Sequence, residues 1–248
     1  HVTLFEDTSF DFIGAATPLR RWGGFAAGYS RQSSGGFERR AGPNDAPVGF
    51  SISQSAVSGG WGLGLAAPGP LKGLTPGVEK PLELGVILRS VREQIDTVSA
   101  SGTALDFGVI LRPRPWAEAG LSINNMIAPK LTFVTTPIPY PRVIDFTPSI
   151  RLKRSSDWTA LLGLRLRNVQ NEGISPSGGI ELQYRRLAAL RLGYQGKGMT
   201  AGTGIRLGNT QFDYAALLHD LGVSHIVSFT QRFGQTREEL EETIRRGI

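Results

Sequence analysis

The sequence has no cysteine, and it has only three histidines and two methionines among its 248 residues. The missing cysteines exclude a disulfide framework and are neutral about the redox compartment. There is also no apolar run close to the about 20 residues that a transmembrane helix requires. If the chain enters a membrane it must do so through strands, and in lipid only a closed barrel satisfies the backbone polar groups of strands.

The few histidines form no catalytic or metal-binding pattern. His219 and His225 flank a predicted turn with Asp220, where a turn acid and a strand-end histidine are the simpler interpretation. Ser224 and His225 are neighbours on opposite faces of a strand, so they cannot act as nucleophile and base. No helix follows Gly202-Thr203-Gly204, which is therefore not a phosphate loop. We predict a non-enzyme with no catalytic residue, no metal site and no cofactor.

Positive charge is in excess but is not concentrated. The formal net charge is +6 and the isoelectric point is about 10.0. The arginines are scattered, mostly one or two per segment, without a basic run or a recognisable nucleic-acid motif. We therefore predict no nucleic-acid partner.

Alternation of apolar with small or polar residues is what the sequence has in abundance. It is clear in Leu105-Phe107-Val109-Leu111 and in Trp158-Ala160-Leu162-Leu164-Leu166. A period of two is typical of a strand with one apolar and one polar face. The segments are about ten residues long, as tilted membrane strands are, and their polar rows are rich in Gly, Ser, Thr and Arg. The pattern favours an all-β transmembrane antiparallel barrel, with a soluble β domain as the alternative.

Aromatic residues near the segment ends suit the interfacial girdles of such a barrel. They are Trp22, Tyr29, Trp61, Trp116, Trp158, Tyr184, Tyr194 and Tyr214. Thirteen segments have the strand pattern. They are Thr8–Leu19, Gly23–Arg31, Gly60–Pro68, Pro81–Asp96, Thr103–Arg112, Trp116–Asn125, Ile144–Arg154, Asp157–Val169, Pro176–Arg185, Leu187–Tyr194, Met199–Leu207, Gln211–Leu218 and Val223–Phe233.

Connections at one end of these strands are predicted to be tight, with Gly69–Lys80 as the exception. Those at the other end are predicted to be mostly longer, as in Gln32–Gly59 and Met126–Val143. Because short turns of outer-membrane barrels face the periplasm, this sets the expected orientation. An even-stranded barrel then needs one further strand, which we expect before His1 together with a signal peptide and an N-terminal segment. An odd barrel, or an uncounted segment at Pro47–Ser55, is the alternative.

The barrel domain is predicted to span residues 1–234, and its last strand ends on the aromatic Phe233. Residues 235–248 are predicted to form a short C-terminal helix on the periplasmic side, with Thr236 as N-cap and Glu239 three residues later. Its apolar residues Leu240 and Ile244 lie on one face. The helix is either a solvated tail or a partner-docking element.

Several segments resemble the PorV-type outer-membrane proteins, which are relatives of the FadL-type fatty-acid transporters. The segments that carry the resemblance are the opening His1 with Phe12-Ile13-Gly14-Ala15-Ala16-Thr17-Pro18-Leu19, Leu82-Glu83-Leu84-Gly85-Val86 leading into Arg92-Glu93-Gln94-Ile95, Ala104 to Pro113, Gly120 to Asn125, Leu192-Gly193-Tyr194, Ala201 to Gly208 and Phe212-Asp213-Tyr214. The resemblance implies a barrel of about fourteen strands with a hatch segment upstream of His1. The insertions at Gln32–Gly59 and Gly69–Lys80 depart from the family pattern.

If the apolar row faces lipid, the charged residues of the other row line the lumen. They are Asp106, Arg112, Glu118, Arg151, Lys153, Arg165, Arg167, Glu181, Arg185, Arg191, Arg206, Asp213 and Arg232. A structural network of carboxylates and guanidinium groups is favoured over a conducting, anion-selective row.

Two functions remain open from the sequence. The resemblance implies a docking or scaffold subunit of a secretion-type cell-envelope complex, bound to outer-membrane lipids and, through extracellular loops or the C-terminal helix, to other envelope proteins. The alternative is a FadL-like channel for the uptake of hydrophobic small molecules, and a general anion pore is a weaker third. Each places the protein in a bacterial outer membrane.

Overall fold

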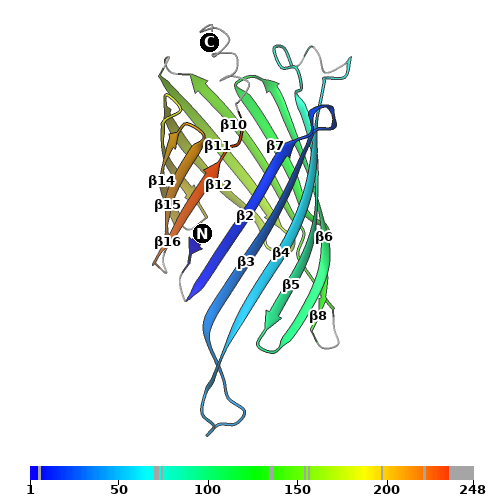
Figure 1. Cartoon of the computed structure of the whole chain (residues 1–248), viewed down its shortest axis with the longest axis vertical. Helices are drawn as coiled ribbons and strands as arrows, with labels where there is room; N and C mark the ends of the chain where they lie inside the picture. The colour runs from blue at the N-terminus through cyan, green and yellow to red at the C-terminus, as the bar shows by residue number, and fades with distance from the viewer. Residues whose placement is uncertain are drawn as a thin grey trace.

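The structure is a computed structural model that describes residues 1–4, 7–69, 73, 75–133, 137–153, 155, 157–196, 198–219 and 222–234. These residues form a closed antiparallel barrel of fourteen strands (Figure 1). The barrel strands are β1 (Val2–Thr3), β2 (Thr8–Pro18), β3 (Gly24–Arg39), β4 (Val48–Leu65), β5 (Leu82–Ile95), β6 (Val98–Arg114), β7 (Ala117–Ile127), β10 (Val143–Lys153), β11 (Trp158–Val169), β12 (Gly173–Tyr184), β13 (Ala188–Gln195), β14 (Gly198–Leu207), β15 (Thr210–His219) and β16 (Gly222–Gln231). The predicted fold class is confirmed.

Nearly every strand pairs with the next one in sequence, as expected for an up-and-down barrel. The exception is a separate hairpin of β8 (Lys130–Thr132) and β9 (Pro137–Pro139), so that β7 pairs directly with β10. No helix among the described residues is long and apolar enough to cross a membrane. The predicted C-terminal helix, with Leu240 and Ile244, lies outside the described residues.

The thirteen predicted strands correspond to β2–β7 and β10–β16. The fourteenth place is held by β1, in which Val2 pairs with Phe10 on one side and with Ile226 on the other. The sheet is therefore closed through β1, a strand of only two residues that lies between β2 and β16 (Figure 1). That a signal peptide, an N-terminal hatch segment and one further strand precede His1 stays a prediction.

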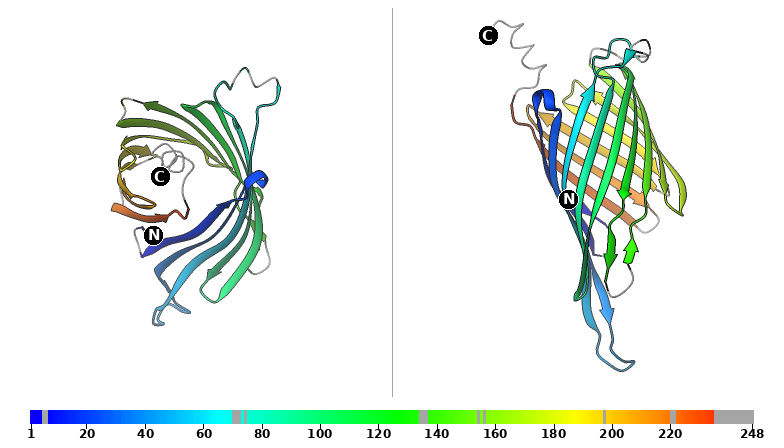
Figure 2. Two further views of the ribbon diagram at one scale, coloured as in Figure 1. Left: turned by 45° about the horizontal axis from the view of Figure 1, so that its top comes forward. Right: turned by 90° about the vertical axis from the view of Figure 1, so that its right-hand side faces the viewer.

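The segment Gln32–Gly59 is not a loop as expected. Strands β3 and β4 continue through it as one long hairpin, which extends past the barrel rim (Figures 1 and 2). Polar residues such as Gln32 and Gln54 face each other across this ladder where the apolar alternation weakens, and Phe37 stacks on Phe50 at 5.4 Å near the tip. The backbone pairing of this hairpin therefore continues beyond the residues that show the apolar alternation.

The predicted contrast between tight and long connections holds only in part. Tight turns occur at both ends, as between β5 and β6 at Asp96-Thr97 and between β6 and β7 at Pro115-Trp116. The longest connections, residues 66–81 and 128–142, leave opposite ends of the barrel. Turn length therefore does not orient this barrel.

The two faces of the wall are chemically distinct. Large apolar side chains such as Ile13, Leu88 and Leu192 are 72%, 57% and 62% exposed on the outer face. Asp106 and Asp145 on the inner face are only 6% and 5% exposed. A soluble domain would bury the apolar row, whereas a barrel in lipid exposes it.

Aromatic side chains gather at the end with the turn between β2 and β3. The Trp61 indole N–H donates to the Trp22 carbonyl at 2.7 Å, and the Trp158 and Tyr184 rings lie 5.0 Å apart. Trp116 lies in the turn before β7 at the same end. These residues form the kind of belt that lies at a membrane interface.

The hairpin of β8 and β9 lies inside the barrel against β6. Pro129 and Leu131 are fully buried, and a Cβ at Gly102 would meet Pro129 at 2.8 Å. Only glycine at this position lets the connection between β7 and β10 lie so close to the wall. The connection therefore narrows one end of the lumen.

Candidate functional site: a two-sided cavity in the lumen

Glycines cover much of the inner wall on β3 to β6. Gly24, Gly62, Gly85 and Gly108 are direct cross-strand neighbours. Ala16, Ala26 and Gly60 form the next row. Because adjacent strands lie about 4.8 Å apart, the row of four glycines gives a wall free of side chains about 14 Å wide.

Neutral polar side chains line the adjoining wall on β7 and β10. Ser122 and Asn124 lie on the same face of β7, and Thr147 on β10 donates to the Gly120 carbonyl at 3.4 Å. The Asn124 side-chain amide donates to Asp145 at 3.4 Å. The side-chain carbonyl oxygen of Asn124 takes no part in this bond. Ser122 lies directly between Gly108 and Asp145 in the register of the sheet.

Together these walls line an open cavity of about 840 Å³. One side of the cavity is the row of Gly24, Gly62, Gly85 and Gly108, here called the glycine wall, together with Ile87 and Ile110. The adjoining side consists of Ser122, Asn124 and Thr147, here called the polar strip. Two carboxylates, Glu83 and Asp106, also line it, and the described lining residues include no lysine or arginine. A cavity of this volume is in the range of small-molecule sites.

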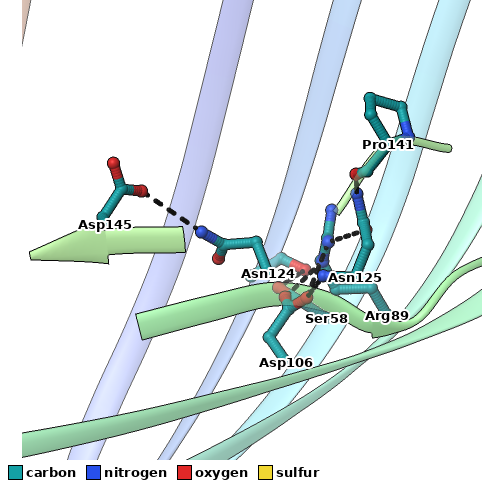
Figure 3. Close-up of polar contacts among 8 residues, drawn as sticks. Ser58, Arg89, Asp106, Asn124, Asn125, Pro141 and Asp145 are labelled. Carbon is teal, nitrogen blue, oxygen red and sulfur yellow. Dashed lines mark hydrogen bonds and ion pairs between the residues drawn. The ribbon is translucent and has the colours of Figure 1, made fainter. Parts of the chain in front are cut away.

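The first carboxylate of the cavity is fully engaged (Figure 3). Arg89 donates to the two oxygens of Asp106 at 2.7 and 2.9 Å, and the backbone N–H of Asn125 donates to one of them at 2.7 Å. Arg89 also donates to the Asn125 side chain at 2.8 Å, and that side chain donates to the Pro141 carbonyl at 2.8 Å. This cluster ties β5, β6 and β7 to the connection between β7 and β10.

The second carboxylate, Glu83, is ion-paired with Arg112, which also donates to Glu118 at 2.7 Å. One guanidinium thus serves two carboxylates. At Asp145 two guanidinium groups serve one carboxylate. Arg165 donates to its two oxygens at 2.7 and 2.9 Å, and the Arg167 Nε lies 3.2 Å from one of them. On the far wall, Arg191 bridges Glu181 and Asp213 at 2.6 and 2.7 Å.

A second cluster joins the connection between β7 and β10 to the wall. The Tyr140 hydroxyl donates to Glu93 at 2.8 Å and accepts from the Gln54 amide at 2.5 Å. Burial, and then the hydrogen bond to Glu93 and its charge, raise the pKa of the Tyr140 phenol well above its usual value. The neutral phenol is therefore the form that holds this contact.

The structure brings most of the predicted lumen residues together as paired groups. Contacts to other side chains are present for Asp106, Arg112, Glu118, Arg165, Arg167, Glu181, Arg191, Arg206 and Asp213. Arg151 lies on the inner face of β10, in register with Leu161. The side chain of Lys153 lies outside the described residues.

Two predicted lumen residues lie just past the ends of their strands. Arg185 is in the turn after β12, where it donates to Asp157 at 2.9 and 3.2 Å. Arg232 follows the last residue of β16, and its backbone N–H donates to the Asn209 carbonyl. Both strands end earlier than the sequence pattern predicts.

Several functional residues were missed from the sequence. Glu83 and Arg89 share the inner face of β5 with apolar Ile87, so this row is not wholly polar. Asp145 lies six residues before the predicted Arg151 and therefore on the same face of β10, so the alternation of this strand also assigns it to the lumen. Tyr140 and Asn125 lie where the strand pattern stops, and the sequence gives no signal for their contacts.

The described residues contain no group of three or more His, Cys, Asp and Glu side chains that could hold a metal ion. No family model matches the chain, and no curated protein matches it. Among solved structures it is similar to a mutant of TodX described as a monoaromatic hydrocarbon channel, with a TM-score of 0.57 and 11% identity. The match covers 90% of this chain and 83% of that one, and it shows a shared barrel fold.

Proposed function

We propose that the protein is a channel of a bacterial outer membrane for the uptake of hydrophobic small molecules. The observation that carries the proposal is the cavity of about 840 Å³ inside a barrel whose outer face is apolar. The solved structure with a similar fold is a channel for monoaromatic hydrocarbons, which supports a transport role over an enzymatic one. The apolar outer face supports outer-membrane lipids as the surroundings.

The test is uptake by whole cells, because the outer leaflet of the outer membrane is the barrier that such a channel bypasses. Cells carrying the barrel are compared with cells carrying an unrelated barrel at the same level. N-phenyl-1-naphthylamine, which fluoresces when it reaches the inner leaflet, is expected to enter several-fold faster with this barrel. Equal rates in the two strains would contradict the channel.

A scaffold role in an envelope complex is the second candidate. The long β3–β4 hairpin, which extends past the barrel rim, is the observation that favours it (Figure 1). Co-purification in mild detergent of a partner that is lost when residues 40–47 are deleted would support this role. Recovery of a free monomer from the native membrane would count against it.

A further inference from the structure

The residues that line the cavity indicate which kind of ligand it binds. We infer that the cavity selects neutral, flat, apolar molecules with one hydrogen-bonding group, such as a hydroxylated aromatic ring system. This inference rests on the proposed uptake function. The inference combines the shape of the glycine wall, the placement of the neutral polar groups and the sign of the charges at the margin.

The glycine wall favours a flat ligand. Peptide planes without side chains form an even surface, and a planar ring system contacts more of such a surface than a coiled chain does. The wall of about 14 Å across the four glycines exceeds the length of a two-ring molecule. Ile87 and Ile110 are the apolar side chains that rise from the same wall.

The polar strip favours one hydrogen-bonding group on the ligand. Ser122 and Thr147 offer hydroxyl groups and Asn124 offers a carbonyl oxygen, and all three lie on the strands that adjoin the glycine wall. A ring seated on the glycines would direct an attached hydroxyl toward this strip. Because such a group pairs with neutral partners, it needs no charge of its own.

The charges at the margin disfavour an anion. Glu83 and Asp106 line the cavity, and no cation does so among the described lining residues. Arg89 donates to Asp106 and Asn125, and Arg112 is shared by Glu83 and Glu118, so both guanidinium groups already have carboxylate partners. A carboxylate ligand would meet two carboxylates whose arginines are already paired, and no lysine or arginine among the described lining residues would bind it.

A ligand series with one ring system isolates each of these effects. Naphthalene, 2-naphthol and 2-naphthoate are competed against N-phenyl-1-naphthylamine on the full-length barrel in detergent at neutral pH. We expect 2-naphthol to bind roughly fivefold more tightly than naphthalene, through one hydrogen bond. We expect 2-naphthoate to bind at least tenfold more weakly than 2-naphthol. Equal binding of 2-naphthoate and 2-naphthol would overturn the inference.

Glycine substitutions test the location. A Cβ at Gly85 would have Trp61 O at 3.7 Å as its nearest neighbour, and one at Gly108 would have Leu121 O at 3.9 Å. Gly85→Val and Gly108→Val therefore fill the cavity without forcing the backbone, and each should weaken 2-naphthol binding at least tenfold. Gly163→Val is the matched control, because a Cβ at Gly163 has no atom within 4 Å and the residue does not line this cavity.

Ser122→Ala tests the polar strip. It should remove most of the preference for 2-naphthol over naphthalene and leave naphthalene binding unchanged. Unchanged 2-naphthol binding in both Gly85→Val and Gly108→Val, with folding verified by the slower migration of heated samples on gels, would overturn the location. Uptake by cells without selectivity for neutral rings would overturn this inference and leave the channel intact, whereas absence of uptake overturns the channel.

Discussion

At the scale of single residues, the lumen is organised around carboxylates that are buried and arginines that reach them. Asp106 and Asp145 come from different strands, yet each receives a guanidinium group with two parallel hydrogen bonds. Such bidentate pairs fix geometry as well as charge, since both oxygens are held. The ion pairs therefore set the relative positions of inner-face side chains around the cavity.

Replacing one member of such a pair should cost more than replacing both. Asp106→Ala leaves the Arg89 guanidinium partly buried without its partner, and we expect a loss of about 3 kcal/mol in the free energy of unfolding. The double variant Arg89→Leu/Asp106→Leu should recover most of this loss. Denaturant unfolding of the barrel in vesicles, followed by tryptophan fluorescence, measures both. A double variant no more stable than Asp106→Ala would contradict the expectation.

The contact between Tyr140 and Glu93 should make the stability of the connection between β7 and β10 depend on pH. Its pKa is raised in the folded protein by burial and by Glu93. The stabilisation from the neutral phenol is therefore fully present below the usual tyrosine pKa of about 10 and is lost as the pH rises above it. The absorbance difference at 295 nm between the protein and its Tyr140→Phe variant should titrate later than a free tyrosine. A difference that titrates at the usual pKa would show that the contact with Glu93 is not made.

Residue parity explains what the sequence could and could not predict at this scale. Because neighbours on a strand alternate faces, Asp106 and Arg191 could be assigned to the lumen from sequence alone. Their partners could not, since the pairing of Arg191 with Asp213 depends on the register of β13, β14 and β15. Tyr140 depends on a connection that folds inward, for which no periodicity exists.

At the scale of elements, the strands were predictable where they cross the barrel wall and not where they leave it. The outer face needs an apolar residue at every second position, and this requirement marks β11 and β6 in the sequence. The β3–β4 hairpin beyond the rim has no such requirement, so its polar residues suggested a loop. The inward hairpin of β8 and β9 is three residues per strand and rich in proline, which is too short to show a period.

The turn between β2 and β3 depends on one glycine. Gly23 has a φ of 87°, and a Cβ there would lie 1.9 Å from the Gly62 carbonyl oxygen. Gly23→Ala should therefore lower the free energy of unfolding by about 2 kcal/mol or more. The matched control is Gly85→Ala, which has room for its methyl group and should be neutral or stabilising by about 0.5 kcal/mol. Equal effects of the two substitutions would contradict this account of the turn.

The connection between β7 and β10 should be held in place by Leu131, which is 1% exposed. Leu131→Ala removes that packing and should expose the neighbouring Lys130 to trypsin, with cleavage at least several-fold faster than in the unsubstituted barrel. Leu190→Ala is the control, because Leu190 is 60% exposed on the outer face. Mass spectrometry of timed digests measures the rates. No change in cleavage would show that the connection is held by its polar contacts alone.

At the scale of the whole molecule, closure of the cylinder depends on β1. Val2 and Ile226 face each other next to the hydrogen-bonded pair of His1 and Val227, whose N–H and C=O groups exchange bonds at 3.0 and 2.9 Å. The chain has no native cysteine, so a cysteine pair introduced here can form one disulfide only.

Val2→Cys/Ile226→Cys should oxidise readily because directly opposed residues on paired strands have suitable separation. The disulfide closes a very long loop and should raise the free energy of unfolding by about 4 kcal/mol. Non-reducing gels of heated samples detect the covalently closed form, and either single variant is the control. Failure to oxidise would show that β1 does not lie between β2 and β16.

The glycine wall has a thermodynamic consequence for any molecule that enters the cavity. Side chains that line most binding sites lose rotamer freedom when a ligand orders them, and glycine has no rotamers to lose. On this wall, binding therefore begins from a surface already in its final shape, fixed by the ladder of β3 to β6. Affinity there is determined by how well the ligand matches a preorganised surface, and little adaptation to other shapes is available.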